Sequence, residues 1–192
     1  MRLLPLATAL ATATLLAACA GTGESRTGSP AAEATSPAAS SSVASATVNL
    51  SAASGSLASG QLKLMPMGGG VHVTGTIGGL KANGAHAFHI HEKGDCSAAD
   101  ASSAGGHFNP AGQPHGRASK PQHHAGDSDN LTANADGSAT VNAHFNGVVL
   151  GGGAATDIIG KAVVVHADPD DYTSQPAGNA GSRIACGVIT AG

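Results

Sequence analysis

The segment HAFHIHEKGDCS, residues 86–97, ends a β-like run with two histidines and continues into a turn and a cysteine. Side chains two residues apart on an extended strand point to one face, so His89 and His91 can both reach one metal ion. His166 ends another β-like run and could supply a third nitrogen. Three imidazoles suit copper. By itself, however, a His-x-His pair is more often two surface or hydrogen-bonded histidines than a pair of ligands.

Short β-like runs separated by glycine, asparagine and aspartate surround this segment and continue from residue 47 to the end of the chain. Asp136-Gly137 lies between two of the runs, as is typical of a tight hairpin. We expect no helix longer than a turn or two. The pattern predicts an all-β domain, an eight-stranded antiparallel sandwich or barrel. The predicted strands are residues 47–52, 61–65, 71–77, 85–91, 131–134, 138–145, 162–166 and 183–189.

Two long gaps between the runs, residues 92–130 and 167–182, are predicted to be functional loops, because loops of this length are otherwise uncommon in a compact domain. The first gap contains several histidines and an aspartate. Three imidazoles and one carboxylate match the tetrahedral shell that zinc accepts. The candidate zinc ligands are His107, His115, His124 and Asp127.

The composition favours a metal site and argues against several other functions. The chain of 192 residues has ten histidines, more than its nine lysines and arginines together. A net charge of −3 leaves no basic stripe for a nucleic acid or an anionic membrane surface. Aromatic residues make up only 2%, so base-stacking platforms are not expected. Three cysteines are too few for a disulfide-dense miniprotein.

The first residues have the layout of an export signal. Arg2 precedes an apolar run, residues 3–18, that is too short to span a membrane. The run ends Leu-Ala-Ala-Cys, which resembles the bacterial lipobox, so we expect residues 1–18 to be a signal peptide and Cys19 to be lipidated. An ordinary signal peptide that happens to contain Cys19 is the alternative. Residues 20–46 have little to bury and are predicted to form a disordered tether to a domain at 47–192. The expected location is the periplasm or cell envelope, with a lipid anchor in the membrane.

Five segments carry a family resemblance: HAFHIHEKGDCS at 86–97, GGHFNP at 105–110, HHAGD at 123–127, VVVHADPDD at 163–171 and GSRIACGVI at 181–189. Together they resemble a copper,zinc superoxide dismutase of the bacterial secreted type. The resemblance runs from about residue 47 to the C-terminus and implies an immunoglobulin-like, Greek-key arrangement of the eight strands.

The resemblance implies one copper and one zinc ion per subunit, with His107 bridging the two. Asp170 is implied to join ligands of both ions through hydrogen bonds, which would fix the orientation of their rings. The implied copper ligands are His89, His91, His107 and His166. The implied zinc ligands are His107, His115, His124 and Asp127.

The resemblance also implies a disulfide between Cys96 and Cys186, with free buried thiols as the alternative. It places Arg183 beside copper, where a guanidinium would attract and hold a small anion. Residues 167–182 contain no lysine, although relatives often use lysines of this loop to steer superoxide. The remaining histidines are expected not to bind metal, namely His72, His86, His123 and His144.

The implied activity is the conversion of superoxide to dioxygen and hydrogen peroxide by alternating Cu(II)/Cu(I) chemistry, with Arg183 and His107 as the catalytic residues. His107 would take up and return a proton in each cycle. Such an enzyme would protect the extracytoplasmic compartment from oxidative damage. It would have no nucleic-acid partner, would meet the membrane through its lipid, and would be a monomer or homodimer. A rival hypothesis is a copper- or zinc-binding protein that stores or delivers metal. An intact His107 and Arg183 favour the enzyme, because a carrier needs neither.

Overall fold

The computed structural model describes residues 39–192, so the predicted signal peptide and Cys19 lie outside the described residues. Each predicted run contains a strand, and the only helical element in the described part is a 3₁₀ turn, Ser102–Ala104. No helix within residues 39–192 is long and apolar enough to cross a bilayer. The strands are β1 (Ala46–Ala52), β2 (Ser59–Met67), β3 (Gly70–Gly78), β4 (Ala85–His86), β5 (Phe88–His91), β6 (Leu131–Thr132), β7 (Ala139–Asn146), β8 (Ala162–His166), β9 (Arg183–Val188) and β10 (Thr190–Ala191).

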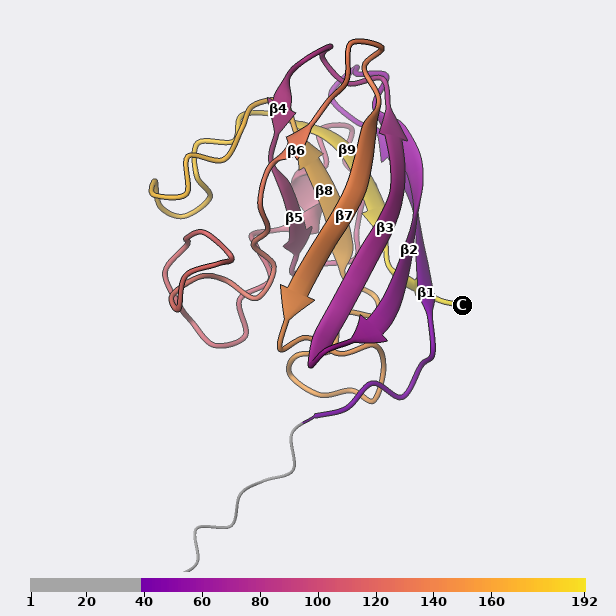
Figure 1. Ribbon diagram of the computed structural model, residues 1–192, viewed down its shortest axis with the longest axis vertical. Helices are drawn as coiled ribbons and strands as arrows, with labels where there is room; N and C mark the ends of the chain where they lie inside the picture. The colour runs from indigo at the N-terminus through magenta and orange to yellow at the C-terminus, as the bar shows by residue number, and fades with distance from the viewer. Residues whose placement is uncertain (1–38) are drawn as a thin grey trace, which may run out of the picture. The chain divides into compact units, whose positions relative to one another are not determined.

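The strands form one curled antiparallel sheet with the order β5-β8-β9-β1-β2-β3-β7, in which β10 also pairs with β1. After β3 the chain crosses to β5 at the opposite edge of this sheet. It then returns to β7, which pairs with β3, and crosses again to β8, which pairs with β5. These crossings give the sheet a Greek-key topology. In Figure 1, β1, β2, β3 and β7 lie in one layer, and β5, β8 and β9 lie behind them. The predicted all-β, Greek-key fold is therefore confirmed.

The predicted strand 85–91 is divided at Ala87. Before this residue, β4 pairs with β6, and after it, β5 pairs with β8. The Ala87 N–H donates to Asp168 O at 3.0 Å, and the Ala87 carbonyl accepts from His166 N–H at 2.9 Å. The chain thus passes from a small two-stranded sheet to the main one at a single residue. This change of partner holds the second long loop against the start of β5.

The two faces of β5 serve different purposes, and every residue of the strand is buried. Phe88 and Ile90 belong to the main hydrophobic core, where Phe88 packs 6.1 Å from Phe145 between ring centroids. His89 and His91 alternate with them and therefore point away from this core. Burying an aromatic or branched side chain contributes about 1.5–3 kcal/mol, so the core anchors the strand that carries the histidines.

A disulfide joins Cys96 to Cys186, as the family resemblance implied, across a sequence separation of 90 residues. In the chain-entropy model a loop of this size contributes about 4–5 kcal/mol to stability. The bond ties the first long loop to β9. Figure 1 shows the first loop and the second, residues 167–182, on the same side of the sheet, beside β4 and β5.

Candidate metal centre

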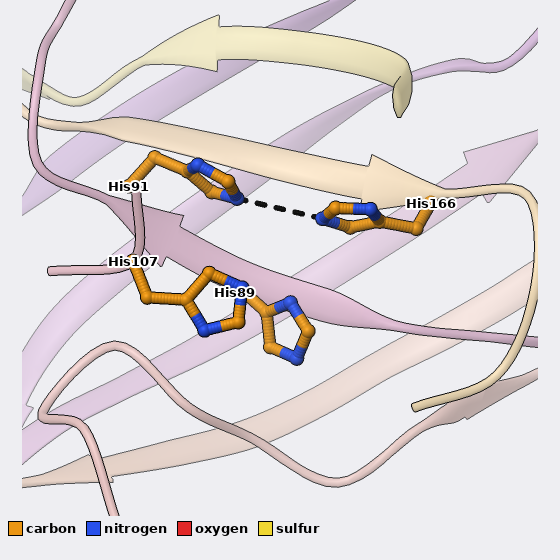
Figure 2. Close-up of side chains that lie close together, drawn as sticks. All are labelled: His89, His91, His107 and His166. Atoms are coloured by element: carbon orange, nitrogen blue, oxygen red, sulfur yellow. Dashed lines mark hydrogen bonds between the residues drawn. The ribbon is translucent and has the colours of Figure 1, made fainter. Parts of the chain in front are cut away.

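The structure brings all seven predicted ligands into two buried clusters that share His107. Within each cluster the candidate ligand atoms lie within 4.8 Å of one another. The first cluster is His89, His91, His107 and His166, which Figure 2 shows together. The second is His107, His115, His124 and Asp127.

Strand register positions the first cluster. His89 and His91 lie on β5, and His166 ends the neighbouring β8. His107 comes from the first long loop, whose backbone continues the sheet: Phe108 N–H donates to Ile90 O at 2.8 Å, and His107 forms an isolated β-bridge with His91. The His107 ring consequently lies over His89, with 4.1 Å between ring centroids.

Two ring nitrogens in the first cluster face each other with no hydrogen atom to donate, an arrangement that favours a bound cation. The His91 Nδ1–H donates to Gly105 O at 3.0 Å, and His166 Nδ1 lies 3.4 Å from Gly181 O. Each ring therefore presents the lone pair of its Nε2, and the two Nε2 atoms lie 3.4 Å apart (Figure 2). Two lone pairs at this distance repel each other unless an ion or a proton lies between them.

Several other ring nitrogens within residues 39–192 are buried without a hydrogen-bond partner. His115 Nδ1 lies 3.0 Å from Asp127 Oδ2, and His124 Nδ1 lies 3.4 Å from Asp127 Oδ1, but neither contact has hydrogen-bond geometry. A buried polar atom left unpaired costs about 1–3 kcal/mol. Metal ions would satisfy all of these nitrogens, so the residues present fit a two-metal centre. Within the two clusters, the unpaired nitrogens are His89 Nδ1, His107 Nε2, His115 Nδ1 and His124 Nδ1.

Three imidazoles of the first cluster, those of His91, His107 and His166, are held in the neutral form that binds metals. Burial and the neighbouring histidines lower the pKa of His91 to about 2 and that of His166 to about 3. Burial also lowers the pKa of His107 to about 4, although Asp127 opposes the shift. These rings are therefore neutral near pH 7, as metal ligands must be.

Asp127 organises the second cluster. Its Oδ1 accepts from His107 Nδ1 at 2.8 Å, and its Oδ2 accepts from the backbone N–H groups of Gly116 and His124 at 3.1 and 2.8 Å. Burial opposes ionisation of this carboxyl group, but the hydrogen bond from His107 and the close contacts of His115 and His124 hold its pKa well below the usual range. Asp127 is thus a fixed negative charge among the rings.

Asp170 connects the two clusters from the second long loop. Its Oδ2 accepts from His89 Nε2 and its Oδ1 from His115 Nε2, both at 2.9 Å. Burial opposes the charge, but hydrogen bonds from His115 and His89 lower the pKa of Asp170. Burial likewise opposes protonation of His115, yet its contact with the Asp127 carboxylate and its hydrogen bond to Asp170 raise its pKa to about 9. A Cβ at Gly178 would overlap Asp170 Oδ1, so only glycine fits there.

Arg183 lies at the edge of the first cluster. Its Nη1 donates to Ala101 O at 2.8 Å and its Nη2 to Gly105 O at 2.7 Å, the carbonyl that also accepts from His91. Partial burial lowers the pKa of Arg183, but an arginine stays charged at neutral pH. A hollow of about 410 Å³ is lined by Arg183, His166 and residues 175–177 and 179–181. The hollow therefore adjoins the first cluster at His166.

Gln175 is a site residue that the sequence analysis missed. Its Oε1 accepts from the backbone N–H of His115, and its Nε2 donates to the backbone carbonyl of His115, both at 2.9 Å. This paired contact fastens the second loop to a residue of the second cluster. Its partner is 60 positions away in the sequence, so no local pattern marks Gln175. Neither cluster includes His72, His86, His123 or His144.

Comparisons with known proteins agree with this geometry. Residues 58–189 match the family model for copper/zinc superoxide dismutase. A protein of Aquifex aeolicus (strain VF5), named as copper-zinc superoxide dismutase 2, is 43% identical over 133 residues, which cover 68% of this chain and 78% of that protein. The crystal structure of a SOD-like protein from Bacillus subtilis is 35% identical with a TM-score of 0.68, and the match covers 74% of this chain and 96% of that one. The clock protein EA4 is 35% identical with a TM-score of 0.69, and the match covers 78% of this chain and 95% of that one.

Replacing Asp170 with Asn should weaken zinc binding about 10- to 100-fold, because His89 and His115 would lose the charged acceptor that orients them. Competition with a zinc chelator measures this affinity. The matched control is Asp168→Asn, an exposed aspartate of the same loop, and it should bind zinc as the unaltered protein does. Equal zinc affinity in the Asp170→Asn and Asp168→Asn proteins would show that the bridging carboxylate is unimportant.

Proposed function

Given that the chain belongs to the copper/zinc superoxide dismutase family, a family of oxidoreductases, we propose that its two clusters hold one copper and one zinc ion and that superoxide is its substrate. The observation that carries this proposal is the pair of buried clusters joined both by His107 and by Asp170. A protein that only stores metal does not need two sites that are connected both by a shared histidine and by a shared carboxylate. Copper is assigned to the cluster of His89, His91, His107 and His166. Zinc is assigned to the cluster of His107, His115, His124 and Asp127.

The donor types support this assignment of the metals. The first cluster offers only imidazole nitrogens, a set that copper binds well, and the second adds a carboxylate, as zinc sites often do. When bound, copper supplies one-electron oxidation and reduction, whereas zinc, with its full d shell, supplies a fixed positive charge. The remaining tasks fall to the side chains of this chain.

His107 is suited to hold a proton during turnover. Its Nδ1 is engaged on the side of Asp127, whereas its Nε2 is on the side of the first cluster and has no partner among the described residues. We assign to His107 Nε2 the uptake of one proton and its return to the reduced substrate. The fixed contacts of the Phe108 and His91 backbone keep this atom in place while its protonation changes.

Arg183 is suited to receive the substrate. Its guanidinium is fixed by two backbone carbonyls and carries a charge at the edge of the hollow above His166. A fixed cation in a partly buried site attracts a small anion and orients it by charge-assisted hydrogen bonds. Among the described residues that line this hollow, Arg183 is the one cation, and residues 167–182 contain no lysine.

We also propose that the protein is exported and attached to the outside of a membrane by a lipid on Cys19. The support is in the sequence: a positively charged start, an apolar run and the motif Leu-Ala-Ala-Cys at residues 16–19. The disulfide between Cys96 and Cys186 fits an oxidising compartment outside the cytoplasm. In that location the enzyme would remove superoxide at the cell envelope.

Superoxide consumption by the purified protein tests the proposed activity. The metal-free protein should be inactive, and reloading with copper and zinc should restore activity. His89→Ala should abolish it, because this change removes a copper ligand from the centre of the cluster. Metal analysis of both proteins accompanies the rate measurement. A protein that binds one copper and one zinc without turnover would favour the metal carrier instead.

Replacing Arg183 with Gln should lower kcat/KM for superoxide by about tenfold, because the site would lose its anion-attracting charge. Arg183→Lys keeps the charge and should lose less activity. Copper and zinc content should be unchanged in both variants. Rates measured at low and high salt add a second readout, since salt should slow the unaltered protein more than Arg183→Gln. A salt response that is equal in the two proteins would refute the guiding role.

Expression of the full chain in a bacterium with an alkyne-labelled fatty acid tests the lipid anchor. The unaltered protein should be labelled and should sediment with membranes, whereas Cys19→Ser should be neither labelled nor retained, because the acceptor thiol is gone. A Cys96→Ser/Cys186→Ser protein controls for labelling at other cysteines. An unlabelled, secreted wild-type protein would show that residues 1–18 are an ordinary signal peptide.

A further inference from the structure

Two histidines and two methionines that the proposed activity does not use lie together on the outer face of β2, β3 and β7. In the register of the sheet, Met65 on β2 is opposite His72 on β3, and His72 is opposite His144 on β7. The residues before and after them in their strands alternate toward the core, where Val71, Val73 and Phe145 are buried. Met65, His72 and His144 therefore form one row across three strands on the opposite face.

The two imidazoles of this row are close and lack protein partners. Their ring centroids are 6.3 Å apart, with 36° between the ring planes. Both Nδ1 atoms are shielded from solvent and make no hydrogen bond in the part of the chain that the structure describes. A shielded, unpaired nitrogen on each of two neighbouring rings is a costly arrangement unless a ligand uses it.

Met67 carries a second thioether on the same face of β2. It is paired with Gly70, the residue two positions before His72 on the same face. A Cβ at Gly70 would lie 3.0 Å from His144 Nε2, so the His144 side chain extends from β7 toward Gly70 on β3. Gly70 in turn is the pairing partner of Met67 on β2. Met65 and Met67 are 48% and 51% exposed, which is unusual for large apolar side chains. Both methionine side chains are thus exposed on the face that carries the two histidines.

We propose that His72, His144, Met65 and Met67 form a separate site that binds copper(I). Thioether sulfur is a soft ligand that selects copper(I), and imidazole nitrogen also suits copper. A site of two histidines alone would not distinguish copper from zinc, whereas the methionines favour copper. None of the four residues belongs to the two clusters of the metal centre. Both histidines were predicted to be non-ligands because they fall within predicted strands, and only the strand register brings them into one row with Met65.

Anaerobic titration with copper(I) of the protein already loaded with copper and zinc tests this site, with a coloured copper(I) chelator as competitor. The loaded protein should bind one further copper(I). Both His72→Gln/His144→Gln and Met65→Leu/Met67→Leu should lose this binding and keep full dismutase activity, which also shows that they are folded. Asn142→Ala, a change on the same face of β7, is the matched control and should bind as the unaltered protein does.

Methionine methyl signals in the NMR spectrum give an independent readout of the same titration. With ¹³C-labelled methionine methyl groups, the signals of Met65 and Met67 should shift as the further copper(I) binds. The proposal is overturned if no further copper(I) binds. It is also overturned if the double methionine variant binds copper(I) as tightly as the unaltered protein.

Discussion

The hydrogen bonds of one carboxylate, Asp170, to His89 and His115 join the two halves of the metal centre. Each bond fixes which nitrogen of the ring carries its proton, and so leaves the opposite nitrogen, Nδ1, directed at a metal position. Asp170 comes from the second long loop, whereas His89 lies on a core strand and His115 in the first loop. The paired contact of Gln175 with the His115 backbone reinforces this connection. The geometry of both clusters therefore depends on how the two loops meet.

The sheet gives these loops a rigid base because β5 and β8 are buried on both faces. On one face, Phe88 and Ile90 pack into the main core, and on the other, His89 and His91 enter the first cluster. A shift of one residue in the register of β5 would exchange the two sets and bury histidines in an apolar core. Hydrophobic packing thus selects the register that assembles the ligands.

Much of the fold could be predicted from local sequence patterns, and the residues that form the two clusters could be predicted from those patterns together with the family resemblance. Alternating runs marked the strands, and the histidines at the ends of two of them marked the first cluster. The division of the strand at Ala87 was not predictable, since it results from hydrogen bonds to Asp168 and His166, far along the chain. The role of Gln175 was not predictable either, since its hydrogen-bond partner is the distant backbone of His115. The row of Met65, His72 and His144 also depends on strand pairing, which no single segment specifies.

The disulfide has a consequence beyond its effect on the unfolded chain. Both carbonyls that hold the Arg183 guanidinium, those of Ala101 and Gly105, follow Cys96 in the first long loop. Arg183 itself shares β9 with Cys186. The disulfide therefore links the strand that carries Arg183 to the loop that carries the two carbonyls to which its guanidinium donates. Without the disulfide, the two hydrogen bonds of the guanidinium would be the direct links between Arg183 and this loop, so the oxidation state of the two cysteines sets how firmly the Arg183 side chain is held.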